Sequence, residues 1–181
     1  MKRIAGALLL AVAVSSCRTA PKIPYKGRTF YTRVNIWYNP LRKEEILSTN
    51  YHSGEILPVG TAVRVTSVSG STIRFKTLES NEEFRLHYIK VYVGVPIEKY
   101  FERMFSDRKP TMVGRFNEKE RKAITLGEVE SGMTRDAVIM SWGYPPAHHT
   151  SSLKNNHWKY WMGRTSTMTV KFYNDEVVSV K

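Results

Sequence analysis

The sequence feature that most constrains the fold is a pair of alternating segments joined by a short turn. Residues 61–68 (TAVRVTSV) and residues 72–78 (TIRFKTL) alternate apolar and polar side chains, and Ser-Gly-Ser occupies residues 69–71. A period of two is typical of a strand with one buried face, and two such strands with a tight turn between them form a hairpin. The side chains expected on the buried face are Val63, Val65, Ile73 and Phe75.

The region around this hairpin is predicted to be a small all-β domain over residues 29–95. Residues 28–38 are rich in aromatic and β-branched side chains, and a turn at residues 79–82 precedes another short apolar segment at residues 84–88. Several short strands separated by tight turns favour a small barrel or sandwich. Residues 57–65 (LPVGTAVRV) resemble the entry to the central hairpin of bacterial Src-homology-three-like barrels.

A helical pattern begins after Pro96 and is predicted to form, with a linker, a segment over residues 96–116. Pro96 suits the start of a helix. The apolar side chains at helical spacing are Ile97, Tyr100, Phe101, Met104 and Phe105, and charged residues fill the other face. Residues 106–114 contain a proline and a glycine and are expected to be a linker.

The rest of the chain, residues 117–181, is predicted to form two helices followed by three antiparallel strands. Asn117 with Glu120 has the pattern of a capping box, so a helix is expected from there to Leu126. Thr134 is a good N-cap for a second helix, which Gly143 and the following prolines should end. The strands are expected at residues 157–161, 167–173 and 177–180, with a turn at residues 174–176. The fold class predicted for the whole chain is α+β.

This last region resembles the SmpA/OmlA (BamE-like) family of outer-membrane lipoproteins. The matching elements are Gly132-Met133-Thr134, Val138, Gly143-Tyr144-Pro145, Trp158-Lys159-Tyr160 and Val170-Lys171-Phe172. The aspartate-glycine turn usual in the family is replaced by Asp175-Glu176. The resemblance implies contact with outer-membrane assembly proteins and lipid headgroups. The residues it nominates for partner binding are Gly132, Met133, Thr134, Val138, Trp142, Gly143, Tyr144 and Pro145.

The amino-terminal segment has the pattern of a lipoprotein signal. A short basic stretch precedes an apolar run over residues 4–14, which is too short to span a bilayer as a helix. Cys17, the only cysteine, follows Val-Ser-Ser as in a lipobox, so residues 1–16 are predicted to be a signal peptide and residues 17–28 a lipidated tether. Arg18 in the next position implies an outer-membrane location, facing the periplasm. The alternative is a plain signal peptide with an incidental cysteine.

Charge is concentrated close to the predicted anchor. The chain has 28 Lys and Arg against 16 Asp and Glu, for a formal net charge of +12. Seven of the basic residues and none of the acidic ones fall in residues 18–43. Contact with anionic lipid and a merely solvated tether are both compatible with this segment. An exported protein does not meet nucleic acid, so that common partner of basic proteins is set aside.

The sequence contains no recognisable catalytic or nucleotide-binding signature, so no catalytic residue and no cofactor are expected. His148, His149 and His157 lie in a polar region without thiols or carboxylates at ligand spacing, and no metal site is expected there. The favoured function is a non-catalytic binding or assembly factor at the outer membrane. The alternative is a peptidoglycan-binding protein with a groove lined by Trp37, Tyr38 and Tyr51, although such residues also pack in sheets. A proteinaceous enzyme inhibitor is a third hypothesis.

Overall fold

The structure is a computed structural model that describes residues 25–181. The predicted signal peptide, Cys17 and the tether up to residue 24 lie outside the described residues.

The first part of the chain contains β1 (Thr29–Thr32), β2 (Ile36–Tyr38), a 3-10 turn (Lys43–Glu45), β3 (Ile46–Leu47), β4 (Glu55–Leu57), β5 (Ala62–Val68), β6 (Thr72–Thr77), β7 (Glu83–His87), α1 (Lys90–Val93), α2 (Ile97–Met104) and β8 (Phe105–Ser106). The second part contains α3 (Glu118–Leu126), α4 (Arg135–Trp142), β9 (His157–Trp161), β10 (Thr167–Tyr173) and β11 (Glu176–Val180).

The prediction of an α+β fold is confirmed, and the predicted hairpin forms the centre of the first sheet. This six-stranded, curled sheet has the order β3-β7-β6-β5-β1-β8, and only the β3–β7 pair is parallel. Strands β2 and β4 form a separate two-stranded ladder. The alternation is confirmed as well, because all the predicted inward side chains are fully buried: Val63, Val65, Ile73 and Phe75.

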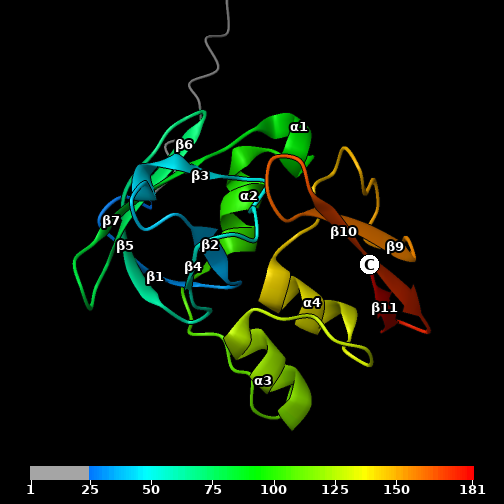
Figure 1. The fold of residues 1–181 in the computed structure, drawn as a ribbon. Helices are drawn as coiled ribbons and strands as arrows, with labels where there is room; N and C mark the ends of the chain where they lie inside the picture. Colours follow the sequence, from blue (N-terminus) through cyan, green and yellow to red (C-terminus); the bar gives the residue numbers. More distant parts are fainter. Residues whose placement is uncertain (1–24) are drawn as a thin grey trace, which may run out of the picture.

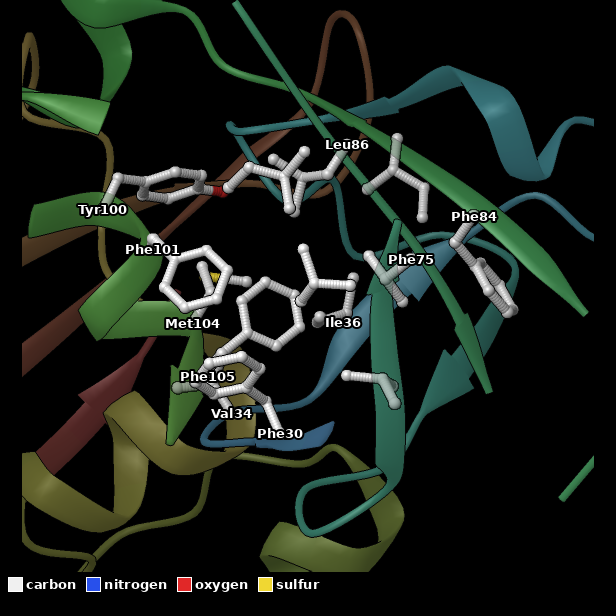
Figure 2. Close-up of a cluster of buried hydrophobic side chains, with 14 of the residues drawn as sticks. Phe30, Val34, Ile36, Phe75, Phe84, Leu86, Tyr100, Phe101, Met104 and Phe105 are labelled. Carbon is white, nitrogen blue, oxygen red and sulfur yellow. The ribbon is translucent and has the colours of Figure 1, made fainter. Parts of the chain in front are cut away.

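Helix α2 covers the buried face of this first sheet. Tyr100, Phe101 and Met104 are buried, and Figure 2 shows them projecting from the helix toward the strands. The helix ends at Met104, so the prediction that Phe105 continues it was wrong. Phe105 begins β8 instead, because its backbone pairs with β1 and its ring enters the same core. A second difference is α1, a single helical turn in a stretch expected to be β.

The second core lies between helices α3 and α4 and the sheet β11-β10-β9 (Figure 1). The predicted capping box is confirmed at Asn117. Its side chain accepts a hydrogen bond from the Glu120 backbone N–H, and the Glu120 carboxylate accepts one from the Asn117 backbone N–H. Glu120 is buried, and its other carboxylate oxygen accepts hydrogen bonds from the backbone N–H and hydroxyl of Thr134. One carboxylate therefore joins the starts of both helices.

Arg135, the first residue of α4, holds the loop before β9 and the last hairpin together. Its guanidinium donates to the Asp175 carboxylate at 2.7 Å, to the carbonyls of Leu153 and Asn155, and to the side chain of Asn156. The same group lies 4.3 Å from the centre of the Phe172 ring, a cation–π distance. Its side chain is only 15% exposed. The sequence offered no signal for this role.

The last hairpin turns at Asn174 and Asp175, one residue earlier than the family's aspartate-glycine position. Both residues have positive φ angles, 48° and 64°, and Tyr173 pairs directly with Glu176. A two-residue turn with two left-handed residues matches the right-handed twist of the strands, and Asn and Asp tolerate this conformation best after Gly. The turn therefore forms without the glycine.

The two cores meet along a seam of buried polar groups from residues 35–52. The Asn35 side chain donates to the carbonyl of Ile124 at 2.6 Å, and the Asn50 side chain donates to that of Trp142 at 3.0 Å. Gly143, which ends α4 as predicted, has φ of +77° and ψ of −172°, a combination that only glycine adopts readily. A Cβ at this glycine would lie 2.9 Å from the Asn50 side-chain nitrogen. The backbone of Gly143 therefore lies directly against the Asn50 side chain, with no room for a Cβ between them.

Helices of residues 25–181 are all too short or too polar to cross a membrane.

Candidate ligand-binding groove

The three aromatic residues that the sequence nominated for a ligand groove lie together in the structure. Trp37 and Tyr38 come from β2, and Tyr51 comes from the loop between β3 and β4. All three are half-buried and line one groove of about 760 Å³. Grooves of several hundred Å³ with aromatic walls and a few polar groups are typical ligand sites. A ligand role for these residues stays a prediction.

Tyr38 is fixed on the side of the groove that belongs to the first sheet. Its ring packs edge-to-face on Phe84 at 5.1 Å, and its hydroxyl donates to the Glu55 carboxylate at 2.8 Å. Burial, the hydrogen bond and the charge of Glu55 raise the pKa of Tyr38 to about 12. The hydroxyl therefore remains protonated at physiological pH and serves as a hydrogen-bond donor, not as a base.

Trp37 points the other way, because adjacent side chains on a strand lie on opposite faces. Its ring lies 5.7 Å from that of His52 and packs against Gly127 at the end of α3. A Cβ on Gly127 would come within 2.8 Å of the indole and 2.4 Å of the Ile56 side chain. Trp37 thus belongs both to the seam and to the groove wall, which agrees with packing and ligand roles alike.

The rim of the groove carries polar groups that sequence reasoning missed. Arg42 pairs with Glu45 across 3.2 Å, and His87 contacts the backbone carbonyl of Glu44 at 2.8 Å. Arg164 comes from the loop between β9 and β10, so both parts of the chain contribute to the site. No local pattern could have found Arg164, since only the packing of the two cores brings it beside β2. The two cations and one carboxylate leave the rim weakly positive.

Behind the groove, His52 is enclosed by aromatic rings. The ring centres of Trp142 and Tyr160 lie 4.7 Å and 5.5 Å away, and His52 Nε2 donates to the Trp142 carbonyl at 2.9 Å. Its Nδ1 has no hydrogen-bond partner among the described residues. Burial lowers the pKa of His52 to about 4, so the imidazole is neutral in the folded protein at physiological pH.

The residues nominated for partner binding by the family resemblance lie mostly inside the molecule. Met133, Val138, Trp142, Gly143 and Pro145 are buried. Thr134 is half-buried and serves as the N-cap of α4, and Tyr144 is half-buried beneath the Arg103 guanidinium. Only Gly132 is well exposed. A partner-binding role for this set stays a prediction, but most of its members shape the core and the seam.

The histidines considered as metal ligands are not assembled into a metal site. The rings of His148 and His149 lie 4.1 Å apart, and the His148 ring is tilted against that of Tyr92 at 4.7 Å. His157 is exposed on β9. Within residues 25–181, no group of three or more histidine, cysteine, aspartate or glutamate side chains is placed to hold a metal ion.

Comparison of the chain with protein-family models, with curated proteins and with solved structures gave no match.

Proposed function

We propose that this protein is a lipid-anchored, non-catalytic binding protein on the periplasmic side of the outer membrane. The lipobox at Cys17 supports the anchor, and the groove walled by Trp37, Tyr38 and Tyr51 supports the binding role. The ligand that suits this groove is an extended envelope polymer such as a peptidoglycan strand. Aromatic faces bind sugar rings and extended chains through their apolar surfaces, and the polar rim provides hydrogen bonds.

The first test replaces Tyr51, because the Trp37 ring packs against His52 and Gly127 and the Tyr38 ring packs against Phe84. Tyr51→Ala is expected to raise the Kd for purified peptidoglycan, measured by sedimentation, about tenfold. Losing a contacting aromatic ring removes about 1.4 kcal/mol of binding free energy. The matched control is Tyr173→Ala, since Tyr173 is 68% exposed and lies on β10 away from the groove. Equal binding by the two variants would rule out the groove as the polymer site.

A role in outer-membrane protein assembly is the second candidate function. The order of two helices and three strands in residues 118–180 is the one that the SmpA/OmlA resemblance implies. Strand β11 is the last strand of its sheet, and residues 132–134 pair with its start, whereas Val178 further along is exposed. Exposed apolar side chains on a sheet edge suit a protein partner. Recovery of outer-membrane β-barrel proteins with wild type and with Tyr51→Ala alike would favour this function over polymer binding.

The anchor is tested by Cys17→Ser, which removes the only thiol able to carry a diacylglycerol. Wild type is expected to stay in the membrane fraction at high salt, since two or more acyl chains give a stable anchor. The variant should remain an unprocessed precursor or be released. Any residual attachment through the basic segment should be lost in salt, because the Debye length is about 8 Å at physiological ionic strength. Wild type that washes off with salt would contradict the anchor.

A further inference from the structure

A second, strongly basic cleft lies away from the aromatic groove. It has a volume of about 440 Å³ and is formed by the turn after β1, the end of α2, the loop after β8 and the start of α4. Its walls carry five basic side chains and one carboxylate: Arg33, Arg103, Arg108, Lys109, Arg115 and Asp136. Its formal charge is therefore +4, whereas the rim of the aromatic groove, with two cations and one carboxylate, is only weakly positive.

Two of the guanidinium groups are held in place by neutral partners. Arg33 donates to the backbone carbonyl of Glu102 at 2.7 Å. Arg103 donates to the carbonyl of Val93 at 3.2 Å and lies 4.6 Å from the centre of the Tyr144 ring. These contacts orient the side chains without neutralising them, and a guanidinium has five N–H donors, so most remain free for a ligand.

The positive charge of the cleft is not balanced by nearby carboxylates. Asp136 is engaged by Arg115 at 2.7 Å. Within residues 25–181, Arg33, Arg103, Arg108 and Lys109 form no ion pair. Residues 1–24 contain no aspartate or glutamate, so that segment cannot supply a carboxylate side chain either. Four like charges around one concavity repel one another, and an anion bound between them relieves the repulsion.

We propose that this cleft binds a phosphate-bearing ligand through a phosphomonoester or diphosphate group. Arginine forks match the geometry of phosphate oxygens, and lysine adds a compact positive charge. A dianionic group suits a cleft of charge +4 better than a single carboxylate does. The volume is within the range of ligand sites. The cleft shares none of its charged residues with the aromatic groove, so phosphate binding by the cleft does not depend on polymer binding by the groove.

The test measures binding of inorganic pyrophosphate to the folded, full-length protein by titration calorimetry at low ionic strength. The exposed pair Arg108 and Lys109 is replaced as Arg108→Gln with Lys109→Gln, and the Kd is expected to rise at least tenfold. The control is Lys154→Gln with Lys171→Gln, which removes the same charge from two exposed positions outside the cleft. The control should keep the wild-type Kd. No binding by wild type, or the same Kd for both double variants, would overturn the proposal.

The phosphate could belong to a soluble molecule or to a lipid headgroup, and vesicles separate the two sources. Vesicles that contain phosphatidic acid, whose headgroup is a phosphomonoester, are compared with vesicles of phosphatidylcholine, using protein with Cys17→Ser so that no acyl chain contributes. Binding to the anionic vesicles that pyrophosphate displaces, and that the Arg108→Gln, Lys109→Gln variant loses, would assign the headgroup. Vesicle binding that is unchanged in this variant, together with its weaker pyrophosphate binding, would assign a soluble ligand.

Discussion

Acidification from pH 6.5 to about 4 is expected to remove about 3 kcal/mol from the free energy of unfolding through His52 alone. Burial among aromatic rings lowers the pKa of this imidazole to about 4 in the folded state, against 6.5 for an ordinary histidine. Below pH 6.5 the unfolded chain therefore binds a proton that the folded chain does not. The stabilisation is complete above pH 6.5 and is lost as the pH falls through the folded-state pKa.

Urea unfolding at pH 6.5 and at about pH 4 measures this effect, with His52→Gln as the variant. Glutamine does not titrate, so the variant should lose about 3 kcal/mol less stability between the two pH values than wild type does. Carboxylates contribute equally to both proteins and cancel in the comparison. The control is His157→Gln, at an exposed position on β9, which should behave as wild type. A His52→Gln variant with the wild-type pH dependence would contradict the assignment.

Replacing Arg135 by alanine is expected to lower the free energy of unfolding by about 3 kcal/mol. The variant loses four hydrogen bonds at once, and the carbonyls of Leu153 and Asn155 are left without this donor. The contact with the Phe172 ring is lost too. Arg135→Lys should retain only a small part of this stabilisation, because an ammonium group cannot reproduce the planar guanidinium that reaches several acceptors.

Chemical denaturation provides the measurement for Arg135, and Arg42→Ala is the matched control. Arg42 makes a single exposed ion pair with Glu45, and such pairs contribute at most about 1 kcal/mol. The near-ultraviolet circular dichroism of Arg135→Ala should change as well, because Trp158 lies beside the guanidinium. Equal losses for Arg135→Ala and Arg42→Ala would show that the Arg135 network does not stabilise the fold.

Local patterns in the sequence predicted those elements whose neighbours are close in the chain. The alternation of Val63 and Val65 identified a strand, and Asn117 with Glu120 identified a helix start, because both patterns act within a few residues. Strand β8 was missed because Phe105 continues the helical spacing of apolar residues. Only its pairing with Thr32, far away in sequence, makes it a strand.

Some residues of the candidate sites could be nominated from the sequence, whereas others come together only through packing of distant segments. Trp37, Tyr38 and Tyr51 could be nominated because aromatic side chains bind glycans and extended peptides through their faces. Their grouping into one groove depends on the packing of the β2–β4 ladder against the second half. Arg164 and the basic cleft had no detectable signal, because their members come from segments that are distant in the chain. The burial of Met133, Val138, Trp142, Gly143 and Pro145 could not be predicted from the family resemblance, because a motif reports similarity and not exposure.

The polar seam between the two cores also places a condition on the order of folding. Asn35, Asn50 and His52 bond to backbone carbonyls that lie 89, 92 and 90 residues further along the chain. The ribosome makes the chain from its amino terminus, so these donors are synthesised long before their acceptors. Contacts between residues so far apart in the sequence form late. The β half should therefore wait in an incomplete state until α4 has emerged. A chain truncated before Trp142 should be a substrate for proteases, not a smaller stable protein.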